Sequence, residues 1–223
     1  MENIVTRLLQ VLLTLPAILL SLSVHELCHG YAAHLLGDPT PKAYGRLSMN
    51  PLKHIDPFGF IALLLFRVGW AKPVMVDSRY FKKPKRDMAI TALAGPISNL
   101  LLAFIFSFLS VFVERIGIGL GLFSGGITPF YVFYLIVYFM VPINLGLFVF
   151  NLIPIPPLDG SKILYAFLPN RIIFKILPYE NYIRLILIIL LWFGFLGTPI
   201  AAAANMIENL FMNLARGVIL YGI

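Results

Sequence analysis

Charged side chains are scarce in this chain. Of its 223 residues, only 12% are Asp, Glu, Lys or Arg, whereas 60% are hydrophobic. Soluble domains carry about 25% charged residues, so the composition excludes an ordinary water-soluble domain. A disordered chain is excluded as well, because it would lack apolar residues. We therefore expect a protein that is surrounded largely by lipid.

Cysteine and carboxylates are also few. Cys28 is the one cysteine, which excludes a disulfide-stabilised scaffold, and the chain has only ten Asp and Glu residues. A charged side chain at the centre of a bilayer costs at least ~2.5 kcal/mol, so ionisable groups inside apolar segments indicate function. Each histidine or carboxylate within an apolar stretch is therefore a candidate site residue.

The positive charge of the chain is concentrated in one region. The formal net charge is +7, and ten of the seventeen Lys and Arg residues fall between Asp38 and Asp87, flanked by long apolar runs. Lys and Arg gather in this way on cytoplasmic loops and near anionic lipid headgroups. The pattern favours the lipid bilayer as a partner and argues against nucleic acid.

Long apolar stretches predict an all-α polytopic membrane protein, a bundle of about four to five spans. A spanning helix needs about 20 mainly apolar residues. Four stretches reach or approach that length, at residues 8–36, 89–113, 129–155 and 185–204. The stretch at 58–69 is too short to cross and predicts a re-entrant segment within a strand-like loop region. Without a repeat or a soluble insertion, we expect residues 1–223 to form one membrane-embedded domain.

The basic loops predict the orientation of this domain. Residues 70–87 hold six Lys and Arg residues, and the loop before them holds Lys42, Arg46 and Lys53. The positive-inside rule places both loops in the cytoplasm. The N-terminus then lies outside, and His25 and Asp159 lie near the same cytoplasmic face of the cell membrane.

Residues 25–29 read HELCH, which is an H-E-x-x-H pattern. Residues four apart share one face of a helix and are separated by about 6 Å along its axis, so His25 and His29 can bind one Zn²⁺. Glu26 is close enough to meet a water whose pKa the metal lowers, and it can act as the general base. The pattern therefore predicts a hydrolytic metal site in an apolar helix.

A third metal ligand must come from elsewhere in the chain. The metzincin pattern requires His at position 35, where this sequence has Leu35. The best candidate is Asp159 in the segment NLIPIPPLDG at 151–160, whose prolines break a helix. Gly160 would permit a turn that aims the carboxylate inward. We therefore expect Asp159 to be the third ligand, with the fourth position open for water.

Three of these segments resemble the site-2 proteases, which are intramembrane zinc metalloproteases of peptidase family M50. They are HELCH at 25–29, AGPISN at 94–99 and NLIPIPPLDG at 151–160. The segments GRLSMNPLKHIDPFG at 45–59 and GWAKPV at 69–74 are similar to compact bacterial members, without the PDZ or CBS domains of larger ones.

The resemblance implies one zinc ion per chain and a set of site residues. By likeness to the family, His25, His29 and Asp159 bind the zinc ion and Glu26 is the catalytic base. The resemblance also suggests that Asn99 faces the active site, where its amide could donate a hydrogen bond to the developing oxyanion.

The expected function is hydrolysis of a peptide bond in or near a transmembrane helix of a membrane-anchored partner protein, with the active site toward the cytoplasm. Such a helix must unwind, and residues 42–76 could pair with the extended substrate by edge addition. Two other classes stay open. One is a metal-dependent membrane enzyme with a different substrate, such as a prenyl-protein protease, whose third ligand would be a later Glu. The other is a non-catalytic metal-binding protein of the same fold.

Overall fold

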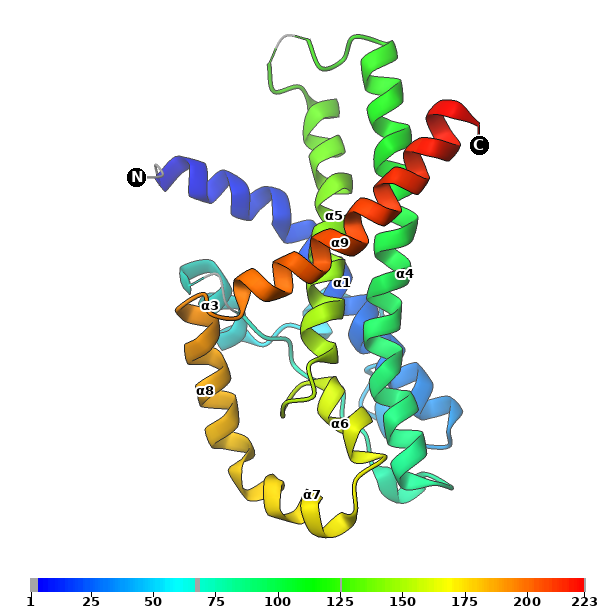
Figure 1. The fold of residues 1–223 in the computed structure, drawn as a ribbon, viewed down its shortest axis with the longest axis vertical. Helices are drawn as coiled ribbons and strands as arrows, with labels where there is room; N and C mark the ends of the chain where they lie inside the picture. The colour runs from blue at the N-terminus through cyan, green and yellow to red at the C-terminus, as the bar shows by residue number, and fades with distance from the viewer. Residues whose placement is uncertain (1–3, 67–68, 125, 223) are drawn as a thin grey trace.

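A computed structural model describes residues 4–66, 69–124 and 126–222 of the chain (Figure 1). The α-helices are α1 (Ile4–Leu35), α2 (Thr40–Ala43), α3 (Pro57–Phe66), α4 (Pro84–Gly119), α5 (Pro129–Leu152), α6 (Asp159–Tyr165), α7 (Asn170–Ile176), α8 (Glu180–Trp192) and α9 (Gly197–Arg216). Short 3-10 turns are η1 (Pro51–Lys53), η2 (Ser78–Tyr80) and η3 (Leu177–Tyr179), and a π-turn, η4 (Gly217–Tyr221), follows α9. Among the described residues there is no β-strand, which confirms the predicted all-α class.

Three long helices form the centre of the molecule. The segments Val11–Leu35 of α1, Pro84–Gly119 of α4 and Pro129–Leu152 of α5 are long and apolar enough to cross a membrane. Each of the three helices contacts the other two. The protein is therefore a multi-pass membrane protein, and these three spans enclose the site described below.

Helix α1 changes direction along its length. In Figure 1 its first part turns away from α4 and α5, whereas its second part runs beside them. Pro16 lies inside the helix, and an internal proline removes one backbone hydrogen bond and bends the helix. The HELCH segment falls in the second part, which is the part that packs into the bundle.

The fourth apolar stretch, at 185–204, is divided in the structure. Helix α8 ends at Trp192 and α9 begins at Gly197, with a bend of 76° in the helical pair that contains the break. Gly194 between them has a φ of +78°, a left-handed conformation that ends a helix. With this bent pair counted as one span, the described residues contain up to four spans.

Helix α9 crosses α4 and α5 diagonally (Figure 1) and packs against both. The buried centre of this contact comprises Ala103, Val141, Leu145 and Ala204. Alanine side chains allow helix backbones to approach closely, as is common between helices in a membrane. The contact fixes α4 and α5 relative to each other on the side away from α1.

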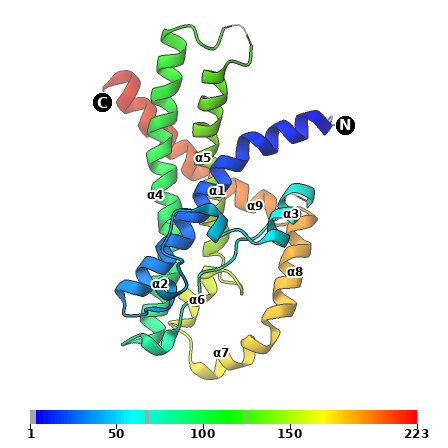
Figure 2. The same cartoon turned by 180° about the vertical axis from the view of Figure 1, so that it is seen from behind.

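The chain between α1 and α4 lies against the second part of α1 (Figure 2). The re-entrant segment expected at 58–69 is helical in α3 up to Phe66, and residues 67–68 lie outside the described part. In the strand-like region the described residues contain one isolated antiparallel bridge, between Ile55 and Ala71. An extended segment then leads from Ala71 to Asp77, and we call residues 71–77 the strap.

Candidate metal centre and active site

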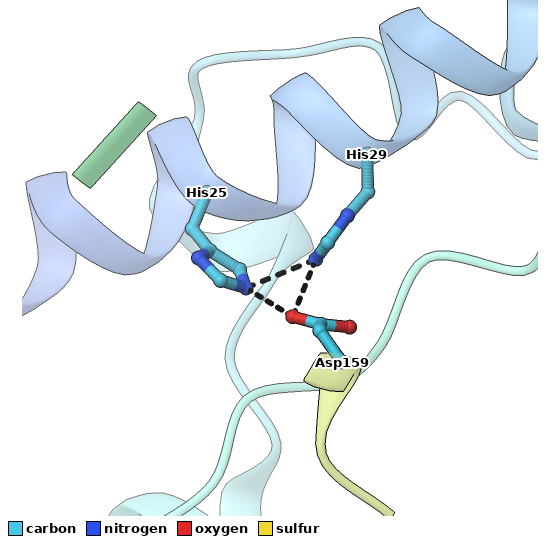
Figure 3. A group of neighbouring side chains, drawn as sticks. All are labelled: His25, His29 and Asp159. Atoms are coloured by element: carbon cyan, nitrogen blue, oxygen red, sulfur yellow. Dashed lines mark hydrogen bonds and ion pairs between the residues drawn. The ribbon is translucent and has the colours of Figure 1, made fainter. Parts of the chain in front are cut away.

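Three side chains that are distant in sequence meet at one point (Figure 3). The Nε2 atoms of His25 and His29 are 3.0 Å apart, and Oδ2 of Asp159 lies 3.2 Å from the former and 3.0 Å from the latter. Ligand atoms about 2.05 Å from a tetrahedral zinc ion would be separated by roughly 3.3 Å. All three residues are buried. The spacing therefore fits one metal ion, as the sequence predicted for these residues.

The hydrogen bonds behind the two imidazole rings determine which nitrogens face the site. The Nδ1 of His29 donates to the backbone carbonyl oxygen of Thr91 at 2.7 Å, and Nδ1 of His25 donates to Oδ1 of Asn99 at 2.5 Å. Each Nε2 atom therefore carries a lone pair. Two such lone pairs and a carboxylate oxygen repel one another unless a cation lies between them, so the donor set fits a metal ion.

Helix spacing and a glycine place the histidines. His25 and His29 are one turn apart on α1 and point toward α4. At Gly95 of α4, a Cβ atom would lie 2.4 Å from Nε2 of His29 and 2.7 Å from Cε1 of His25. Gly95 thus leaves the space that the two rings occupy between α1 and α4.

Asp159 is placed by the chain that follows α5. That helix ends at Leu152, the proline-rich segment turns, and α6 begins at Asp159. The predicted reason for Gly160 needs correction, because its φ is not positive and it lies in the first turn of α6. A Cβ atom there would lie 2.3 Å from the carbonyl oxygen of Leu152, so the glycine is needed for close packing beneath Asp159.

Glu26 is held by the strap. Its Oε2 accepts a hydrogen bond from the backbone N–H of Val74 at 2.8 Å, and the side chain is buried. The strap is fastened by Asp38, whose Oδ2 accepts from the N–H of Asp77 at 2.7 Å. Hydrogen bonds from Arg79 lower the pKa of the Asp77 carboxyl below its usual range. The base expected from the sequence therefore lies under an anchored backbone segment.

Asn99 lies beside the metal site but behind His25. It is fully buried, its Oδ1 bonds to His25, and its Nδ2 donates to Oδ1 of Asn144 at 2.8 Å. The amide expected to donate to an oxyanion is therefore engaged with α5 in this structure. A single amide in an apolar helix does not indicate its partner, so the sequence alone does not reveal the contact of Asn144 with Asn99.

An apolar cavity of about 410 Å³ lies next to the site. It is bounded by α1, α3, α5 and the α8–α9 bend, and its lining includes Leu22, Phe60, Phe150 and Leu191. Ser23, two residues before His25, also lines it. The cavity therefore brings apolar surface close to the helical turn that carries the metal-facing histidines.

Comparison with known proteins agrees with this geometry. The model of peptidase family M50 matches residues 13–124 and 123–194. The chain is 41% identical over 174 residues to the candidate zinc metalloprotease YwhC of Bacillus subtilis, a match that covers 78% of this chain and 77% of the relative.

Two more distant relatives carry similar names. The chain is 29% identical over 187 residues to the candidate zinc metalloprotease Rip2 of Mycolicibacterium smegmatis, covering 81% of this chain and 66% of the relative. It is 36% identical over 108 residues to the candidate zinc metalloprotease MJ0611 of Methanocaldococcus jannaschii, covering 48% of each. No solved structure matches the chain. Because the family model and the Bacillus relative both match most of its length, the chain belongs to peptidase family M50, the family of the site-2 proteases.

Proposed function

We propose that this protein is an intramembrane zinc metalloprotease that hydrolyses peptide bonds in or near the transmembrane helices of membrane-anchored partner proteins. The observation that carries the proposal is the convergence of Nε2 of His25, Nε2 of His29 and Oδ2 of Asp159 inside a bundle of membrane-spanning helices, with Glu26 next to His25 in the sequence. Family membership supports the same chemistry.

His25, His29 and Asp159 would hold one zinc ion per chain. When bound, zinc supplies Lewis-acid polarisation of the scissile carbonyl and of the attacking water. The chain provides three ligands, which leaves room in a tetrahedral arrangement for water or substrate, as is typical of catalytic sites. Lys162 lies 3.4 Å from Oδ1 of Asp159 and so engages the carboxylate oxygen that faces away from the histidines.

Glu26 would act as the general base and then as the general acid. It follows His25 directly, which brings its carboxylate to the edge of the metal site, and the N–H of Val74 holds one oxygen. The carboxylate can accept a proton from water during attack on the carbonyl and return it to the leaving amine. Asn99 would support the metal site through His25, because its Oδ1 accepts the hydrogen bond from Nδ1 of that ring.

The strap and the cavity would receive the substrate. The N–H groups of Lys72 and Val74 bond to His54 and Glu26, toward the protein. In an extended segment the alternate residues, Pro73 and Met75, would present their backbone groups on the opposite side. Pro73 has no N–H and offers only its carbonyl oxygen, so the N–H would come from Met75, which is 57% exposed. An unwound substrate segment could add to this edge while its apolar side chains enter the cavity beside α1.

We also propose a single domain with its active site toward the cytoplasm. Support comes from the loop before α4, which carries basic residues and lies at the end of the bundle near α6 (Figure 2), the helix that begins at Asp159. Lys85, in the first turn of α4, donates to the carbonyl oxygen of Leu168, which ties the start of α4 to the segment after α6. The positive-inside rule then places this end in the cytoplasm.

The deciding experiment uses the purified protein in lipid vesicles with a membrane-anchored reporter. Glu26→Gln should retain zinc and abolish cleavage, because an amide cannot accept the proton. A non-catalytic metal-binding protein would show no difference between the two forms. A prenyl-protein protease would instead cleave a prenylated peptide and leave an unmodified single-span reporter intact. Either of those results would reject the proposal.

A further inference from the structure

A chain of buried hydrogen bonds leads from the backbone of α5 to His25. Its side chains are Asn144 of α5, Asn99 of α4 and Ser21 of α1, all fully buried. Nδ2 of Asn144 donates to the Met140 carbonyl oxygen at 2.7 Å and to Oγ of Ser21 at 2.8 Å. Its Oδ1 accepts from Nδ2 of Asn99 at 2.8 Å, and Oδ1 of Asn99 is 2.5 Å from Nδ1 of His25. Each of the three central helices therefore contributes a side chain to this series of hydrogen bonds.

The donors and acceptors in this series of hydrogen bonds can be arranged in only one direction. The Met140 carbonyl oxygen can only accept, so it keeps Nδ2 of Asn144 on its own side and turns Oδ1 toward Asn99. Oδ1 of Asn144 accepts a hydrogen bond from Nδ2 of Asn99, so Oδ1 of Asn99 is the atom that faces His25. An oxygen acceptor at this position requires the proton of His25 to be on Nδ1. The lone pair is therefore on Nε2, which faces His29 and Asp159.

We propose that Asn144 is a positioning residue that acts through Asn99 to keep His25 in the tautomer that can bind a metal ion through Nε2. The inference rests on the proposed function, because the tautomer matters only where His25 is a ligand. Without Asn144, Nδ2 of Asn99 keeps only its contact with the Ser21 carbonyl oxygen, at 3.5 Å. The amide can then rotate by half a turn and present Nδ2 to His25, which favours a proton on Nε2. His29 needs no such support, because the Thr91 carbonyl cannot reverse its role.

The tautomer can be read directly in the full-length, metal-free protein labelled with ¹⁵N-histidine. The chain has only four histidines, so the spectrum is sparse. In the wild type we expect Nδ1 of both His25 and His29 to carry a proton, whether or not a further proton replaces the absent metal ion on the Nε2 side. In Asn144→Leu we expect His25 to become a mixture of tautomers and His29 to remain unchanged. His29 thus serves as an internal reference for an intact site.

A matched variant separates positioning from packing. In Asn144→Asp the buried carboxyl in its neutral form can donate its O–H to the Met140 carbonyl oxygen and keep its other oxygen directed at Asn99, so we expect it to preserve the tautomer of His25. The zinc affinity of Asn144→Leu should fall in proportion to the share of the metal-binding tautomer of His25 that remains, about tenfold where that share is about one tenth. Ser107→Ala removes a fully buried hydroxyl on α4 that does not belong to this series of hydrogen bonds, and it should leave the zinc affinity within threefold of the wild type.

The proposal is overturned if Asn144→Leu leaves His25 in the wild-type tautomer, or if Asn144→Asp scrambles it to the same extent. Where the leucine is not accommodated, Asn144→Ala tests the same prediction with a smaller side chain. Failure of the proposed function gives a different result. In that case the wild type binds no zinc, although the tautomers of its metal-free form still follow the expected pattern.

Discussion

Gly95 of α4 lies directly against the imidazole ring of His29 on α1. A Cβ atom at Gly95 would be 2.4 Å from Nε2 and 2.5 Å from Cε1 of that ring. Neither distance is tolerated between non-bonded atoms. The His29 ring cannot move aside easily, because its Nδ1 is hydrogen-bonded to the Thr91 carbonyl oxygen, which lies on the same helix as Gly95. The glycine therefore decides whether the two helices can enclose the metal-facing histidines.

The first prediction follows from this contact. Gly95→Ala should displace both rings and lower the zinc affinity at least tenfold, or about 1.4 kcal/mol, with loss of reporter cleavage. Zinc affinity can be measured by competition with a chromophoric chelator. Gly119→Ala is the matched control on α4, because a Cβ atom there meets nothing within 4 Å. Equal affinities for the two variants would contradict the prediction.

The local part of the site could be predicted from the sequence because it follows from short-range geometry. Helical spacing places His25 and His29 on one face, and few carboxylates were available to complete the set, which pointed to Asp159. The structure brings these three residues together. Apolar length likewise predicted the three central helices, since hydropathy depends on composition alone.

The remaining features depend on how the helices lie against each other, which no local pattern records. Gly95 and Asn144 matter because of the relative position of α1, α4 and α5, which the sequence does not indicate. The bend between α8 and α9 was missed for another reason. Residues 193–196 are nearly as apolar as their neighbours, so a count of apolar residues does not detect the break.

The second prediction concerns the third ligand. Asp159→Ala removes Oδ2 from the site and should lower the zinc affinity by two orders of magnitude or more, about 2.7 kcal/mol. Lys162→Ala removes the partner of the other carboxylate oxygen and should change the affinity less than threefold, because the lysine side chain is 45% exposed. Metal analysis of both purified variants decides the matter. Unchanged zinc in Asp159→Ala would remove Asp159 from the site.

The third prediction tests the strap over Glu26. Val74→Pro removes the backbone N–H from which Oε2 of Glu26 accepts a hydrogen bond, at a residue that lies outside any helix or strand. We expect kcat for reporter cleavage to fall about tenfold with zinc content unchanged, since the base loses its anchor but the ligands do not. Val74→Ala keeps the N–H and should retain more than half of the activity. A loss of zinc in Val74→Pro would show instead that the strap supports the metal ligands.

The fourth prediction concerns Asp38, which fastens the strap at its far end. Its carboxylate is fully buried and accepts from the N–H groups of Thr40 at 2.9 Å and Asp77 at 2.7 Å. Asp38→Ala leaves both N–H groups without this partner and should reduce the free energy of unfolding by about 2 kcal/mol.

A graded series makes the Asp38 prediction specific. Asp38→Asn keeps one oxygen acceptor and should lose about half as much stability. Asp56→Ala is the matched control, because its carboxylate accepts from one N–H, that of Gly59, at a half-exposed position and should cost about 1 kcal/mol or less. Thermal unfolding in detergent with zinc present gives the ranking. A smaller loss for Asp38→Ala than for Asp56→Ala would mean that the strap is held by its side-chain packing rather than by this carboxylate.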